Sequence, residues 1–236
     1  MAPEPERPIQ AQAAERGSAL ALLPLAATLD YYALPASFQE QTLVQLAPQL
    51  LAYLALALWA AHNRDIASRL GLEKRKIRDG LRCGLLTGLL LGCLNSFMIL
   101  IVVPLLGWDI AFLKSTPHAQ LPPFVMVPWF ICGIALFVEL NFRGFLLGRL
   151  AALETPLWNS ESARRLSPLA LLTSALTFAF DPFMVRTFQH LHWIAMWDGL
   201  VWGIIWIRTR NLYAPIVAHA VEVVVMYCAV RAALIP

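Results

Sequence analysis

Apolar residues follow one another in seven long stretches, which short polar or basic segments separate. A helix needs about 20 apolar residues to cross the hydrocarbon core of a bilayer. The first and fifth stretches are short, and the first contains Asp30, so either can be partly interfacial. We predict an all-α polytopic transmembrane helical bundle with six to eight spans. The stretches are Ala19 to Leu34, Leu43 to Ala61, Leu81 to Leu106, Phe124 to Leu147, Leu166 to Phe180, Trp193 to Ile207 and Leu212 to Val230.

Residues 1–17 differ from the rest of the chain because they are polar and rich in proline. We expect them to form a disordered tail, and no signal-peptide pattern is evident in them. Residues 18–236 show no internal repeat and no long linker. This second part therefore indicates one integral membrane domain.

Basic residues gather in three of the polar segments, whereas the segment from Trp108 to Pro123 carries only Lys114. Loops rich in Lys and Arg usually stay on the cytoplasmic side. Seven spans and a cytoplasmic N-terminus would place all three clusters there. We therefore predict an integral protein of the inner or plasma membrane in this orientation. The clusters are Arg64, Arg69, Lys74, Arg75, Lys76, Arg78 and Arg82; Arg149, Arg164 and Arg165; and Arg208 and Arg210.

The composition supports a membrane protein and argues against a soluble domain or a nucleic-acid-binding protein. The chain has 236 residues, 59% of them hydrophobic and only 14% charged, whereas a soluble domain is about a quarter charged. The net charge of +3 comes from juxtamembrane residues without interleaved aromatic residues. We therefore expect a lipid bilayer and no nucleic acid as partner. The four cysteines form no CxxC pair, which favours a packing role.

Small residues recur at helical spacing in two of the stretches. Gly84, Gly88 and Gly92 lie four residues apart, as do Gly199 and Gly203. Such a stripe allows two helices in a membrane to approach closely. We interpret both stripes as helix-packing features.

Ionisable residues inside the apolar stretches are the strongest functional signal. Glu139 and Arg143 lie four residues apart, so on a helix they share a face and can pair. His219 and Glu222 lie three residues apart in the last stretch. Charged groups within a bilayer are unfavourable and usually mark a functional site. A functional site that uses both pairs requires the fourth and the last apolar stretch to meet.

An enzyme that hydrolyses a peptide bond inside a membrane must bring water to the bond and activate it. It needs a base, usually a carboxylate or histidine, and a group that stabilises the oxyanion. Glu139 is the best candidate for the base, Arg143 can hold it in place, and His219 is the best second group. Further candidates are Asp181, His190, His192 and Glu222.

Two parts of the chain carry a family resemblance. The string Glu139-Leu-Asn-Phe-Arg143-Gly144 resembles the first signature of the CPBP family, the type II CAAX prenyl protease, bacteriocin-processing and Abi-like group. The segment from Gly199 through Arg208-Thr and Leu212-Tyr-Ala-Pro to His219 resembles the last two spans of this family. The resemblance covers residues 128–227, with the fragments in the family's order.

Three positions depart from the family pattern. The first of its two adjacent glutamates falls on Val138, and the asparagine of its His-x-x-x-Asn motif falls on Val223. The Phe-x-x-x-His motif places Pro182 where histidine belongs, although Phe188 and His192 satisfy the same spacing. The site can therefore be rebuilt from neighbouring polar residues, or it can have lost its activity.

The resemblance implies an intramembrane endopeptidase that cleaves a membrane-anchored or lipidated protein. Glu139 would be the general base, Arg143 would position it, and His219 would stabilise the oxyanion or help hold water. His192 is favoured over Asp181 as the third group, and His190 and Glu222 are possible accessories.

Metal use is the least defined part of this prediction. The resemblance leaves zinc possible, but zinc in an enzyme usually has three protein ligands, and one clear His and one clear Glu are too few. We therefore expect no cofactor.

Two other functions compete with the protease. One is a non-catalytic scaffold or immunity-type protein that binds partner helices, which Val138, Pro182 and Val223 favour. The other is a small transporter, which the lack of repeats disfavours.

Depth in the membrane also bears on the site. Asp181 to His192 falls toward the outer end of its span, whereas Glu139 lies near the cytoplasmic end. A broken or re-entrant fifth segment would remove this mismatch.

Overall fold

The computed structural model describes residues 15–235, with the side chains at 117, 118, 130, 163 and 164 excepted. Residues 1–14 of the predicted disordered tail lie outside this range. The described elements are all helical, which confirms the predicted all-α class. The α-helices are α1 (Leu22–Ala33), α2 (Ala36–Gln39), α3 (Thr42–His62), α4 (Ile66–Leu70), α5 (Ile77–Phe97), α6 (Val103–Leu105), α7 (Pro117–Gln120), α8 (Pro123–Val125), α9 (Ile134–Glu139), α10 (Gly148–Glu154), α11 (Glu161–Leu166), α12 (Pro168–Ala179), α13 (Pro182–Phe188), α14 (Ile194–Thr209) and α15 (Tyr213–Leu234).

Four helical segments are long and apolar enough to cross a membrane. The pair α12 and α13 adds a fifth if the two helices count as one span, bent by 53° at its break. The predicted count of six to eight is not confirmed, because α1 has only 12 residues and α14 only 16. The four segments are Thr42–His62, Ile66–Leu105, Pro123–Leu157 and Tyr213–Leu234.

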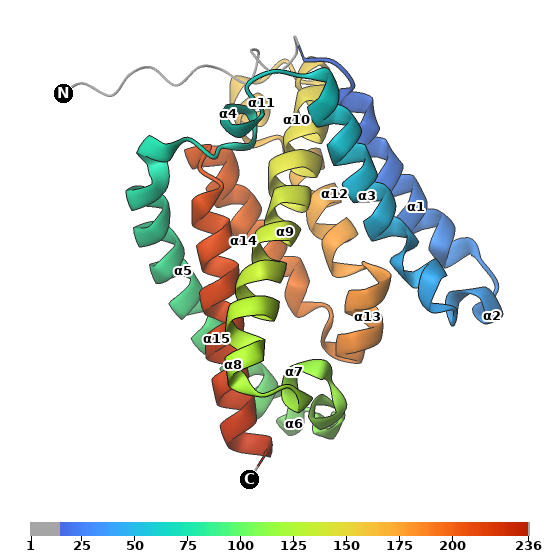
Figure 1. Cartoon of the computed structure of the whole chain (residues 1–236), viewed down its shortest axis with the longest axis vertical. Helices are drawn as coiled ribbons and strands as arrows, with labels where there is room; N and C mark the ends of the chain where they lie inside the picture. Colours follow the sequence, from blue (N-terminus) through green and yellow to red (C-terminus); the bar gives the residue numbers. More distant parts are fainter. Residues whose placement is uncertain (1–14, 236) are drawn as a thin grey trace.

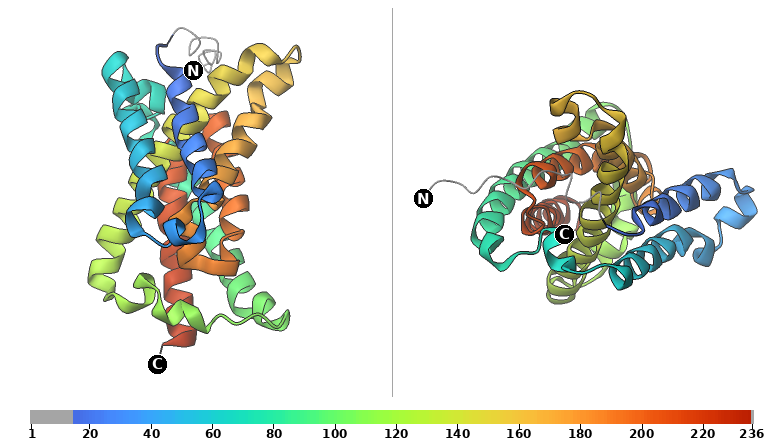
Figure 2. Two further views of the ribbon diagram at one scale, coloured as in Figure 1. Left: turned by 90° about the vertical axis from the view of Figure 1, so that its right-hand side faces the viewer. Right: turned by 90° about the horizontal axis from the view of Figure 1, so that it is seen from above.

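The long helices lie side by side along the molecule, and the start of α1 and the end of α15 lie at opposite ends (Figure 1). The hairpin of α1 and α3 leans away from the other helices (Figure 2). The three basic clusters meet at the end where α4 and α11 lie. There Lys76 Nζ donates to the Arg210 carbonyl at 2.9 Å, and Arg149 pairs with Glu15, which also binds Arg69. This clustering agrees with the predicted loop arrangement, while the orientation in a membrane remains a prediction.

The glycine stripe on α5 packs directly against α15. A Cβ added at Gly84 would lie 2.6 Å from the Ala214 carbonyl oxygen, and one at Gly88 would lie 2.6 Å from that of Ala218. Larger residues would therefore force the helices apart, which confirms the packing role predicted for this stripe. The close approach brings Asn95, one turn beyond Gly92, against α15.

The fifth segment is broken, because α12 ends just before Asp181 and α13 begins at Pro182. The Asp181 side chain accepts hydrogen bonds from the backbone N–H groups of Phe183 at 3.0 Å and Met184 at 3.3 Å, so it caps α13. Proline suits the first position of a helix because its missing N–H would be unpaired there anyway. A broken fifth segment is the arrangement that the sequence analysis allowed for, while the depth of these residues in a membrane stays a prediction.

Candidate active site

Glu139 and Arg143 form the predicted pair, and His219 joins them. Arg143 Nη1 lies 3.1 Å from Glu139 Oε1, and His219 Nδ1 lies 2.9 Å from the same oxygen. The fourth and last apolar stretches therefore meet, as the hypothesis required. Glu139 ends α9, and the π-helical stretch Leu140–Leu147 that follows carries Arg143. Such turns often occur at functional sites.

Aromatic rings fix Arg143 and His219 from the other side. The Arg143 guanidinium lies 4.5 Å from the centre of the Phe178 ring and 4.9 Å from that of Trp202. Trp202 also stacks on the His219 ring, with centroids 4.4 Å apart and an interplanar angle of 18°. Cation–π contacts of this kind stabilise a buried cation. The three polar groups are thus held in place by packing and by each other.

Gly199 provides the room for this arrangement. A Cβ at Gly199 would lie 3.2 Å from Arg143 Nη2 and equally close to Ala175. At Gly203, one turn further along α14, an added Cβ would lie 2.5 Å from Leu171 of α12. The second glycine stripe therefore packs α14 against α12 and lets the guanidinium approach, which confirms its predicted packing role.

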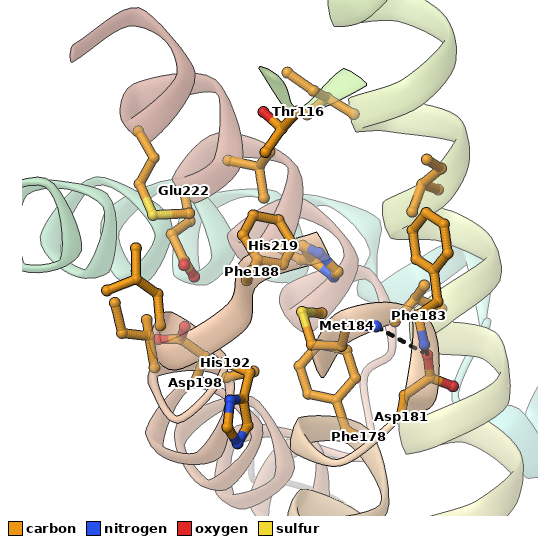
Figure 3. A pocket seen from close by; sticks show the side chains of 18 of the residues that line it. Thr116, Phe178, Asp181, Phe183, Met184, Phe188, His192, Asp198, His219 and Glu222 are labelled. Carbon is orange, nitrogen blue, oxygen red and sulfur yellow. Dashed lines mark hydrogen bonds between the residues drawn. The ribbon is translucent and has the colours of Figure 1, made fainter. Parts of the chain in front are cut away.

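A largely apolar cavity of about 720 Å³ opens beside this cluster. His219 lines it, whereas Glu139 is fully buried and the side chain of its neighbour Val138 reaches the cavity. Figure 3 shows His219 between Asp198 and Glu222 on one side and Asp181 on the other. The other polar residues that line the cavity include Gln49, Asn141, His192 and Arg231.

The predicted candidate Glu222 belongs to a second polar cluster, whose other members, Asn95 and Asp198, were not expected from the sequence. The Asn95 amide Nδ2 lies 3.1 Å from both Asp198 carboxyl oxygens and 2.7 Å from Glu222 Oε1. Trp197 Nε1 donates to Asn95 Oδ1 at 2.9 Å. Asn95, Asp198 and Glu222 are at most 3% exposed. The sequence could have indicated these residues as it indicated Glu139, because each is a polar side chain within an apolar stretch.

The remaining candidates occupy different places. Asp181 lines the cavity, but its side chain caps α13 and accepts from Gln49 Nε2 at 2.8 Å. His192 also lines the cavity, and its Nδ1 lies 2.6 Å from the Gln189 carbonyl. His190 packs between the rings of Trp108 and Phe112, with centroid distances of 5.3 and 5.2 Å.

The donor set does not fit the zinc ion that the resemblance left possible. Within residues 15–235, no three His, Cys, Asp or Glu side chains are placed to hold a metal ion together. A catalytic zinc usually takes three protein ligands. We therefore derive no step through a metal.

Comparison with known proteins relates part of the chain to a protein family. Residues 120–225 match the family model described as type II CAAX prenyl endopeptidase Rce1-like. Comparison with curated proteins and with solved structures finds no match. The matched region contains Glu139, Arg143, His219 and Glu222, and with four apolar helices it suggests an integral membrane protein of a protease family. Over residues 120–225, the chain is therefore similar to type II CAAX prenyl endopeptidases of the Rce1-like family, which supports the resemblance found in the sequence.

Proposed function

We propose that this chain is an intramembrane endopeptidase that cleaves a membrane-anchored or lipidated protein. The observation that supports this most is the hydrogen bond between Glu139 and His219 at the wall of a cavity. A carboxylate that holds an imidazole beside a substrate-sized space is an arrangement found in hydrolases. The family match supports the same reaction class.

In the proposed mechanism, His219 rather than Glu139 takes the proton from water. Glu139 is fully buried, and one of its oxygens already binds both Arg143 and His219. In this mechanism the Nδ1–H group donates to this Glu139 oxygen, which leaves Nε2 without a proton and able to accept one. Glu139 then fixes the tautomer and stabilises the imidazolium that forms. This assignment revises the sequence-based expectation in which Glu139 itself was the base.

Arg143 balances the charge of Glu139 in this interior. A buried carboxylate without a cation is strongly unfavourable, and the ring faces of Phe178 and Trp202 hold the guanidinium at the required place. Arg143 is therefore a positioning residue in the proposed site.

The amide of Asn141 is the candidate for the oxyanion donor. Asn141 follows Glu139 by two residues, lines the cavity and is only 2% exposed. A donor fixed before the reaction stabilises the charge that develops on the scissile carbonyl.

The shape and lining of the cavity support an apolar substrate. Its walls come from several helices, and its aromatic and aliphatic side chains outnumber the polar ones. Pockets of this size bury ligands mainly through such side chains, while a few polar groups orient them. The representative apolar residues are Leu46, Ile99, Phe137, Phe183, Met226 and Val230.

The test is cleavage of farnesylated CAAX peptides by the full chain in proteoliposomes. His219→Ala removes the proposed base, so we expect the rate to fall by at least about 100-fold. The matched control is His62→Ala, which changes an exposed histidine at the end of α3 and should leave the rate unchanged. Retained cleavage by the His219→Ala variant would contradict the proposal. Binding without cleavage by the wild type would instead favour a non-catalytic scaffold.

A further inference from the structure

Asp198 and Glu222 form a pair of buried carboxyl groups that the mechanism above does not use. They come from α14 and α15, and Asn95 of α5 joins them through its Nδ2. Asp198 is 3% exposed and Glu222 is 1% exposed, yet both line the cavity. Residues from three helices thus meet at one point of the cavity wall.

The charge of this pair is not balanced by its hydrogen bonds. The Asn95 amide group carries two hydrogens, whereas three carboxyl oxygens lie within 3.1 Å of its nitrogen. Glu222 Oε2 has no hydrogen-bond partner among the described residues, and the neighbouring cation, Arg143, forms its ion pair with Glu139. Two negative charges this close in an apolar interior repel each other. One shared proton removes this repulsion.

A second observation indicates a polar ligand in the same cavity. Asn141 is 2% exposed, lines the cavity, and has no hydrogen-bond partner for its side-chain oxygen among the described residues. Buried polar atoms normally have a partner, so such an orphan requires an explanation. The backbone of a peptide substrate would supply the missing donor.

The pair is also well placed relative to His219. Glu222 follows His219 by three residues on α15, and residues with this spacing are neighbours on a helix surface. Figure 3 shows Asp198 and Glu222 together on one side of His219. A scissile bond that lies beside His219 would therefore also lie next to the carboxyl pair.

We propose that the Asp198–Glu222 pair is the general acid of the proposed protease, and this inference rests on that function. His219 Nε2 takes a proton from water as the hydroxyl oxygen bonds to the scissile carbonyl carbon. When the C–N bond breaks, the pair gives its shared proton to the leaving amine. The imidazolium then returns a proton to the pair through the cavity. One water is consumed, and a carboxylic acid and an amine are released.

Asn95 is a positioning residue for this acid. It binds both carboxyl groups through one nitrogen and is itself held by Trp197. The glycine stripe on α5 brings Asn95 close enough to α15 to do so. The acid therefore depends on a helix that lies outside the region matched by the family model, residues 120–225.

The test compares two leaving groups on the same farnesyl-cysteine peptide, an amide and a 4-nitrophenyl ester. A nitrophenolate leaves without a proton, whereas an amine needs one. We therefore expect Asp198→Asn and Glu222→Gln to lower amide cleavage by about 10²–10⁴-fold and to keep ester cleavage close to the wild-type rate. His219→Ala should lose both reactions. Asp109→Asn, the same change at a carboxylate in an exposed loop, should affect neither.

The outcomes separate this inference from the proposed function. If Asp198→Asn and Glu222→Gln lower both reactions equally, or neither, the acid role is wrong while the His219 result still supports the protease. If the wild type cleaves neither probe, the protease itself is contradicted and the acid role falls with it.

Infrared spectroscopy tests the shared proton without any substrate. The full chain at neutral pH should show the C=O stretch of a protonated carboxyl group, and the double variant Asp198→Asn with Glu222→Gln should lose it. An unchanged band would overturn the proposal.

Discussion

A single carboxylate oxygen of Glu139 binds both a guanidinium and an imidazole in an apolar interior. Removing only the carboxylate would leave the Arg143 cation with ring faces as its main support. An unpaired buried charge typically costs about 3–5 kcal/mol, whereas replacing both partners by apolar residues is often neutral. The pair is therefore more important for function and for local order than for stability.

A double-mutant comparison tests this view of the Glu139–Arg143 pair. We expect Glu139→Leu to lower the free energy of unfolding by more than the double variant Glu139→Leu with Arg143→Leu does. Denaturation with SDS from mixed micelles measures both values. If the single and double variants lose the same free energy of unfolding, the loss of Glu139 does not leave an unfavourable unpaired charge on Arg143.

Residues that share a helix were predictable, and residues that meet across helices were not. The four-residue spacing of Glu139 and Arg143 indicated their pairing, and the apolar context singled out His219. Asn95 lies 103 positions from Asp198 and 127 from Glu222, so no local spacing links them. Asn141 also lines the cavity, because it follows the lining residue Val138 by three positions and the two share a helix face.

At the scale of elements, the contact between α5 and α15 positions the carboxyl pair. Gly88→Ala would place a Cβ 2.6 Å from the Ala218 carbonyl oxygen, a backbone atom that cannot rotate away. We expect a lower Tm in detergent and weaker amide cleavage, because Asn95 would move away from Glu222. The matched control is Gly133→Ala, where no atom lies within 4 Å of the added Cβ. A Tm equal to that of the control would contradict the role of this contact.

The break between α12 and α13 shows what apolar length leaves undetermined. The stretch Leu166 to Phe180 predicted a short span, and a broken fifth segment was one arrangement that the sequence allowed. The 53° bend accompanies the capping of α13. It places Asp181 and His192 beside the same cavity as His219, and this placement depends on packing between helices.

At the scale of the whole molecule, the basic segments meet at one end and α15 ends at the other (Figure 1). Charged loops are expected on the cytoplasmic side, so this end should face the cytoplasm. Cytoplasmic placement would put the basic cluster against anionic lipid headgroups. The loop that contains Ser115 would then face the opposite side.

Cysteine labelling decides this orientation. In a variant with the four native cysteines replaced by serine, Arg64→Cys and Ser115→Cys each introduce one exposed thiol, at opposite ends of the bundle. A membrane-impermeant maleimide should label Cys at position 115 in intact cells, and Cys at position 64 only in inverted vesicles. The reverse pattern would show that the basic end faces outward, and labelling of both from one side would contradict the span arrangement itself.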